Sequence, residues 1–212
     1  MPVISRGLEG VIAAETRVGD VRGDVGQLIY RGYDINELAG KVSYEETVHL
    51  LWHGRLPTQR ELETLTIALR AEREVPQTVI DFIRSAPKTA APIDVMRTAV
   101  SMLGCFPTVR HDLDMSENEA IAIKLVAQIG IIAAYFHRAR TGLDLPPLRK
   151  DLGEAAHFLW LMKGAEPTAE EAATLDVAYV LHAEHGFNAS TFTARVVAST
   201  LSDMYSAISA AI

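Results

Sequence analysis

The sequence contains a single cysteine, Cys105, in 212 residues. One thiol excludes an internal disulfide, and chains without disulfides are typical of reducing compartments, so we predict a cytoplasmic protein. Cys105 follows a predicted helix, where a core position is more typical than a reactive nucleophile. The N-terminal residues show no apolar stretch of signal-peptide length, which agrees with that prediction.

Cationic residues are also scarce, because 20 Lys and Arg against 27 Asp and Glu give a net charge of −7. No basic cluster compensates, so a nucleic-acid partner is not expected. The most apolar stretch, residues 121–136, is interrupted by Lys124 and Gln128 and is too short to cross a bilayer. No membrane partner is therefore expected. Gly-rich phosphate loops and a nucleophile elbow are absent as well, which disfavours nucleotide-binding enzymes of those classes and hydrolases with a serine triad.

Helix signals, by contrast, are abundant. Four capping boxes, in which a hydroxyl and a glutamate three residues later satisfy early backbone N–H groups, start at Ser43, Thr58, Ser116 and Thr168. Glycines that end helices by adopting a left-handed conformation are predicted at Gly54, Gly104, Gly142, Gly164 and Gly186. The pattern predicts an all-α fold with helices near 44–53, 59–73, 76–85, 92–103, 117–140, 151–163, 169–185, 189–201 and 204–212.

The first 40 residues differ from the rest. Residues 10–17 and 27–31 carry β-branched and aromatic side chains, and turn formers lie between them, at Gly19-Asp20, Gly23-Asp24 and Gly26. We predict a small β hairpin or meander in residues 1–40, packed on a helical large domain formed by residues 41–212.

The predicted helix 117–140 is apolar on nearly every side from Leu125 to Phe136. A helix that is apolar all round is buried all round. Two interpretations stay open: a partner subunit covers it in a helix-on-helix interface, or it is the central core helix of one subunit.

The densest polar cluster is His182-Ala-Glu-His185-Gly-Phe-Asn188-Ala-Ser190. His182 and His185 are predicted in the last turn of helix 169–185, where the helix dipole favours a cationic imidazole. Asn188 is predicted to cap the next helix, whose free N–H groups favour an anion at the same corner. We therefore predict that His185, Asn188 and Ser190 bind a small carboxylate. Glu184 argues against this site unless its carboxylate points away.

Two other interpretations of the histidines compete with anion binding. His182 and His185, or His49 and His53, could each supply part of a metal site, but a zinc or di-metal site needs more ligands than one such pair. Alternatively, the histidines at 182 and 185 merely cap carbonyls at a helix end. The favoured prediction includes no metal.

Several segments together resemble the N-terminal part of citrate synthases, in matching order and spacing over essentially the whole chain. They are Gly7–Val11, Tyr30–Ile35, Leu51–Pro57, Pro92–Ser101 and His182–Arg195. The resemblance implies a helical large domain and condensation of acetyl-CoA with oxaloacetate, followed by hydrolysis of citryl-CoA to citrate and CoA. It also implies acetyl-CoA as a substrate, no cofactor, and a homodimer formed through helices near 92–103 and 117–140.

By the same resemblance, His185 corresponds to an oxaloacetate-binding histidine, and Asn188 and Ser190 line the same corner. His182 is expected to contact these residues and not the substrate itself. The family's catalytic histidine and aspartate have no counterpart among residues 1–212, so we expect no catalytic residue in this span. The apolar residues at Ile212 also suggest a truncated chain that is inactive alone. The alternatives are a 2-methylcitrate synthase, which uses propionyl-CoA, and a non-catalytic helical dimerisation module.

Overall fold

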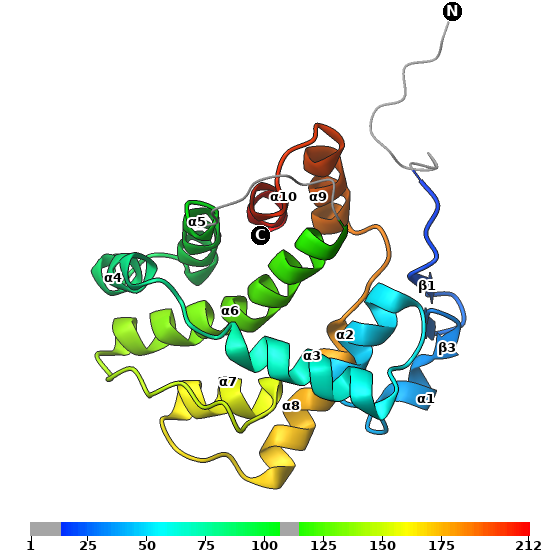
Figure 1. Cartoon of the computed structure of the whole chain (residues 1–212), viewed down its shortest axis with the longest axis horizontal. Helices are drawn as coiled ribbons and strands as arrows, with labels where there is room; N and C mark the ends of the chain where they lie inside the picture. The colour runs from blue at the N-terminus through cyan, green and yellow to red at the C-terminus, as the bar shows by residue number, and fades with distance from the viewer. Residues whose placement is uncertain (1–13, 107–114) are drawn as a thin grey trace, which may run out of the picture.

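The computed structural model describes residues 14–106 and 115–212, and helices dominate it (Figure 1). A small antiparallel sheet, in the order β1-β2-β3, lies at one edge of the molecule beside a short helix, α1. The bounds of these elements are Gly19–Arg22 for β1, Gln27–Tyr30 for β2, Tyr33–Asp34 for β3 and Ile35–Leu38 for α1.

Nine longer helices follow in the described part of the chain. They are α2 Tyr44–His53, α3 Gln59–Ala71, α4 Gln77–Ser85, α5 Pro92–Leu103, α6 Met115–Thr141, α7 Glu154–Lys163, α8 Ala169–His182, α9 Ala189–Ser199 and α10 Met204–Ala211. The predicted all-α fold with a small N-terminal β meander is confirmed.

Most helix starts lie where the capping signals placed them. Ser43, Thr58 and Thr168 each form the predicted capping box, in which the side chain accepts from the backbone N–H three residues later. The prediction for Ser116 is wrong, because Ser116 lies within α6, whose described part already includes Met115. Gly104 is also wrong as a left-handed helix end, since its φ is −64° and it stays in the right-handed region.

The strand prediction is right for one strand and wrong for the other. Gln27–Tyr30 forms β2 as expected, and Gly23 to Gly26 make the turn before it. Gly19 and Asp20, predicted as turn formers, instead pair with Tyr30 and Ile29 as part of β1. Residues 14–17 form no strand, and the rest of the predicted 10–17 strand lies outside the described residues.

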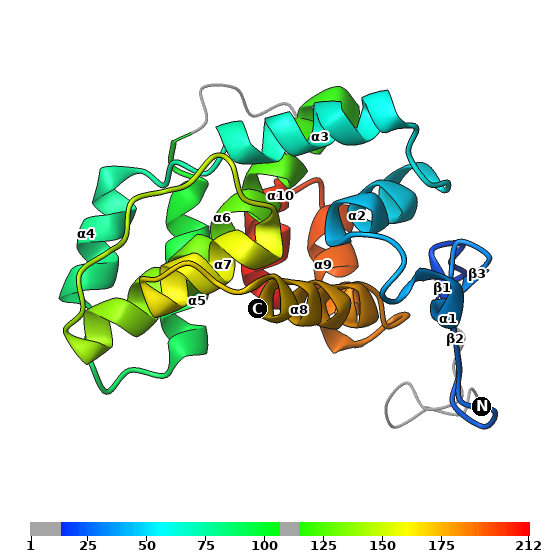
Figure 2. The same ribbon diagram turned by 90° about the horizontal axis from the view of Figure 1, so that it is seen from below.

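Helix α6 runs through the middle of the molecule and contacts α3, α4, α5, α7 and α10 (Figures 1 and 2). Its side chains from Ile131 to Phe136 are mostly buried and belong to the main hydrophobic core. By length and composition alone α6 could also span a bilayer, although the core helix of a soluble protein passes the same test, and 44% of its most apolar window is buried. The contacts within one chain thus agree with the core-helix interpretation for residues 131–136.

A buried polar network joins α7 to the chain that follows α3. The Arg73 side chain is fully buried and donates to the carbonyls of Arg149 and Leu152 and to Glu154 Oε1, the last at 2.5 Å. The Glu154 backbone N–H in turn donates to Glu45 Oε1 at 2.8 Å. Both α3 and α7 are shorter than predicted, and Arg73 and Leu152 lie just outside them.

The buried imidazole of His157 on α7 makes stability depend on pH. Its Nε2 accepts from the Arg149 backbone N–H at 3.4 Å, so the ring is neutral in the native state. Burial, reinforced by the charges of Arg73 and Arg149, lowers the pKa of His157 to about 3. A lowered histidine pKa means that the unfolded chain takes up the proton first as pH falls.

We therefore expect His157 to make its full contribution to the free energy of unfolding above its unfolded pKa of about 6.5. Below that pKa, the contribution should decrease by about 1.4 kcal/mol per pH unit. Chemical denaturation between pH 7 and pH 4 tests this on the protein and on His157→Gln, which cannot take up that proton. The free energies of unfolding of the two should converge as pH falls. Curves that stay parallel would contradict the prediction.

A candidate anion-binding corner between α8 and α9

The candidate site lies where α8 ends and α9 begins, next to the sheet. Helix α8 ends at His182, not at residue 185 as predicted, so only His182 occupies the last turn and His185 lies beyond it. The reason is a long-range contact. The Glu184 backbone N–H, which would otherwise continue the helix, donates to the Tyr30 hydroxyl at 3.2 Å.

The two histidines have different roles in the local structure. His182 is exposed, and its Nδ1 donates to the Ala178 carbonyl at 2.7 Å, which fixes the ring on its own helix. The His185 ring is exposed and has no hydrogen-bond partner within the described residues. His182 is thus locally bonded, whereas His185 is free to contact a ligand.

Asn188 forms the predicted N-cap of α9, since its side-chain oxygen accepts from the Thr191 backbone N–H at 2.8 Å. The first N–H groups of α9 that precede Thr191 have no intrahelical acceptor, and a helix start of this kind favours an anion. Ser190, in the first turn, is exposed, and its hydroxyl makes no hydrogen bond within the described parts of the chain. The corner therefore offers backbone donors, a hydroxyl and the nearby His185 imidazole.

The Glu184 carboxylate lies against β1, and one of its oxygens is bonded to the backbone just after His185. Its Oε1 accepts from the Gly186 backbone N–H at 2.6 Å, and its Oε2 is buried against β1. A Cβ added at Gly19 would lie only 2.0 Å from Oε2. Glu184 is therefore held between β1 and the Gly186 N–H.

Two residues near the corner were not identified from the sequence. Tyr30, from β2, is fully buried and contacts Leu181 and Glu184 through its hydroxyl. Nothing local to Tyr30 in the sequence indicates that contact. Arg195 on α9 lies over the Phe187 ring, 4.8 Å from its centroid. Its spacing of seven residues from Asn188, two helical turns, was the available signal.

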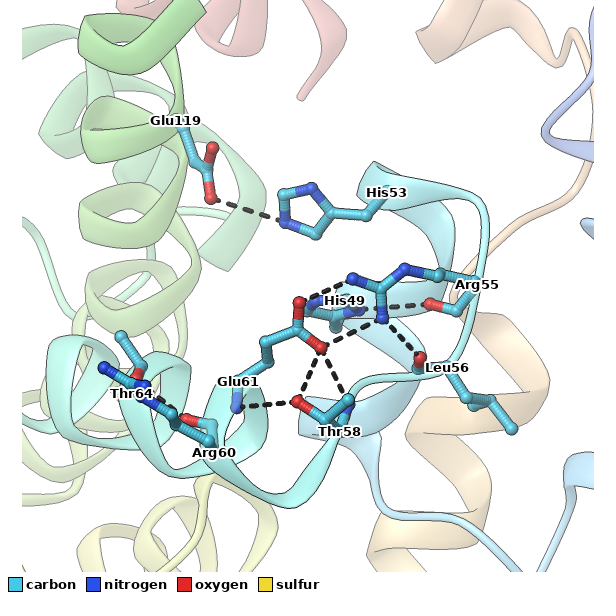
Figure 3. Close-up of polar contacts among 9 residues, drawn as sticks. All are labelled: His49, His53, Arg55, Leu56, Thr58, Arg60, Glu61, Thr64 and Glu119. Carbon is cyan, nitrogen blue, oxygen red and sulfur yellow. Dashed lines mark hydrogen bonds and ion pairs between the residues drawn. The ribbon is translucent and has the colours of Figure 1, made fainter.

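The second histidine pair lies elsewhere, between α2, α3 and α6 (Figure 3). His49 Nδ1 donates to the Arg55 carbonyl at 3.1 Å, and the His53 Nε2 lies 3.4 Å from Glu119 Oε1. The two rings are tilted by 43° relative to each other, with centroids 4.3 Å apart. Among the described residues, no group of three or more His, Cys, Asp or Glu side chains is arranged to hold a metal ion.

Cys105 is exposed, which corrects its predicted core position.

The comparisons with known proteins match citrate synthases and 2-methylcitrate synthases. Residues 7–212 match the family model described as citrate synthase, C-terminal domain. The chain is 42% identical to a citrate synthase of Haloferax volcanii, over 99% of this chain and 56% of that relative. It is also 41% identical to a 2-methylcitrate synthase of Shewanella oneidensis, over 97% of this chain and 54% of that protein.

Solved structures agree with the sequence relatives. The citrate synthase of Pyrobaculum aerophilum superposes with a TM-score of 0.91 at 40% identity, covering 98% of this chain and 54% of that one. The citrate synthase of Thermoplasma acidophilum, solved with carboxymethyl coenzyme A and oxaloacetate, superposes with a TM-score of 0.93 at 29% identity, covering 100% and 55%. The chain spans about half the length of the curated relatives that it matches. From its family model, its relatives and its fold, the chain belongs to the citrate synthase family.

Proposed function

We propose that the protein containing this chain condenses acetyl-CoA with oxaloacetate and hydrolyses the resulting citryl-CoA to citrate and CoA. The observation that carries the proposal is the corner between α8 and α9, where His185 and Ser190 have no partner within the described residues and the N-terminus of α9 favours an anion. Family membership supports the same chemistry, and the T. acidophilum relative was solved with oxaloacetate and a coenzyme A analogue.

In this proposal each residue of the corner contributes to binding oxaloacetate. One substrate carboxylate lies at the first N–H groups of α9, which Asn188 holds in place by capping Thr191. His185 donates to the substrate, and Ser190 orients it through its hydroxyl. His182 supports the corner from its fixed position on α8. A preorganised set of donors stabilises negative charge better than water does, because the donors need not reorient during the reaction.

The proposal assigns the rest of the site to residues outside this chain. The chain spans about half of its relatives, and we propose that the base which removes a proton from acetyl-CoA belongs to the remaining part. Residues 1–212 alone would then be inactive. We also propose a homodimer formed through α5 and α6. Ile93 on α5, with 48% of its surface exposed, offers apolar area for such an interface.

Whether the acyl substrate is acetyl-CoA or propionyl-CoA is a separate question. A 2-methylcitrate synthase, which would condense propionyl-CoA with oxaloacetate, is supported by relatives of that name at 39–41% identity, a range that overlaps the 40–43% of the citrate synthases. The pocket that selects the acyl group is proposed to lie in the remaining part of the protein. Relative rates with acetyl-CoA and propionyl-CoA, measured on the full-length protein, distinguish the two activities.

Thiol release from acetyl-CoA, with and without oxaloacetate, tests the proposed function. We expect the full-length protein to release CoA only when oxaloacetate is present, and residues 1–212 alone to release none. Release by the full-length protein that does not depend on oxaloacetate would indicate a thioesterase. No release with either thioester, from a folded dimer, would favour the alternative of a non-catalytic dimerisation module.

A further inference from the structure

The Tyr30 hydroxyl holds the chain on the N-terminal side of His185. It lies 3.2 Å from the carbonyl of Leu181 and 3.2 Å from that of Glu184, and it accepts from the Glu184 N–H at 3.2 Å. The side chain is fully buried, and burial raises the pKa of Tyr30, so the hydroxyl keeps its proton to donate. A residue of the N-terminal sheet thus satisfies backbone groups that the end of α8 leaves unpaired.

Glu184 holds the chain on the other side of His185. Its Oε1 accepts from the Gly186 N–H at 2.6 Å, and its Oε2 is buried against β1, at Gly19. The residues directly before and after His185 are therefore both anchored, while the His185 ring itself is exposed. Fixing the backbone on both sides limits where that ring can point.

From this arrangement we infer that Tyr30 and Glu184 are positioning residues, which orient His185 for the dicarboxylate substrate and so make oxaloacetate affinity depend on the N-terminal sheet. The inference rests on the proposed function, since it concerns the same corner. An alternative is that the contacts only stabilise the fold. The positioning role and the purely stabilising role predict different results. If His185 is no longer oriented, oxaloacetate binds more weakly at this corner. If only stability is lost, the amount of folded enzyme decreases.

Tyr30→Phe in the full-length protein tests the inference, because phenylalanine keeps the ring and removes only the hydroxyl. We expect KM for oxaloacetate to rise about 5- to 10-fold, as expected for the loss of about one hydrogen bond. We expect KM for acetyl-CoA to change less than about 2-fold. Tyr33→Phe is the matched control. Tyr33 lies in the same sheet, is half-buried, and its hydroxyl has no hydrogen bond within the described residues.

Two further measurements separate positioning from stability. Backbone hydrogen exchange at residues 184–187 should be faster in Tyr30→Phe than in Tyr33→Phe, because only the former releases the Glu184 N–H. Gly19→Ala should also raise KM for oxaloacetate, since its Cβ would displace the Glu184 carboxylate. It offers a second variant if Tyr30→Phe does not fold.

Several outcomes would overturn the inference. An active protein with unchanged KM for oxaloacetate in Tyr30→Phe and Gly19→Ala would leave the proposed function intact and refute the positioning role. A lower melting temperature with both KM values unchanged would assign Tyr30 to stability alone. An unmodified protein without oxaloacetate-dependent thiol release would refute the proposed function, and the positioning role with it.

Discussion

Arg73→Ala is expected to lower the free energy of unfolding by about 3–5 kcal/mol, the cost of removing one partner from a buried ion pair. The Arg73 side chain is 0% exposed and that of Glu154 is 9% exposed, and their nitrogen and oxygen lie 2.5 Å apart. Alanine would leave the Glu154 carboxylate buried without its cation. It would also leave the carbonyls of Arg149 and Leu152 without their donor.

The loss should be larger at pH 8 than at pH 5. Burial raises the pKa of Glu154, and the Arg73 charge opposes that rise. Without Arg73 the pKa rises further. A carboxyl with a raised native pKa favours folding at low pH, where it is protonated, and that contribution is lost as pH increases through the raised value. Protonation at pH 5 would therefore relieve part of the cost.

Chemical denaturation at the two pH values checks this prediction. Arg97→Ala is the control, because Arg97 pairs with Asp94 at 2.7 Å on the surface, with side chains that are 49% and 56% exposed. Its loss should change the free energy of unfolding by about 0.5 kcal/mol or less. Equal losses for the two variants would contradict the importance assigned to the buried network.

His185→Ala is expected to reduce kcat/KM for oxaloacetate by about 100- to 1,000-fold, the usual effect of removing one donor that stabilises charge in the transition state. This expectation depends on the proposed function. The His185 ring is exposed and makes no hydrogen bond or ion pair within the described residues, so its removal should cost little stability. Steady-state kinetics of thiol release on the full-length protein, with a melting curve for each variant, measure both effects.

His182→Ala is the matched control for this prediction. His182 lies three residues earlier, is also exposed, and its ring is bonded to the Ala178 carbonyl. We expect its loss to reduce kcat/KM about 10-fold or less, the effect of one local hydrogen bond. If His182→Ala has the larger effect, the two histidines exchange roles. If neither variant changes the kinetics, oxaloacetate binds at another site.

The sequence predicted the features that depend on neighbouring residues. Capping boxes at Ser43, Thr58 and Thr168 join groups only three residues apart, so their residue types reveal them directly. The same is true of Asn188, whose cap was predicted from its place before α9. Ser116 is the exception, because it lies within α6 and not before it.

Local patterns were insufficient where distant residues compete with a helix for backbone groups. The Gly186 signal predicted that α8 would continue to residue 185, and Gly186 does have a left-handed φ of 65°. The helix nevertheless ends at His182, because the hydroxyl of Tyr30, 154 residues away in the chain, takes the Glu184 N–H. The place of His185 outside the helix was therefore not visible in the sequence.

Family membership and fold class could thus be predicted from residue order alone, because helix signals are local and the matching segments are specific. The tertiary structure decided which side chains meet. Arg73 and Glu154 are 81 positions apart, and no periodicity relates them. It also decided the direction of the Glu184 carboxylate, which the close approach of Gly19 allows. Hydrogen bonds between distant segments form only when packing brings those segments together, and so the geometry of the candidate site depends on the whole fold.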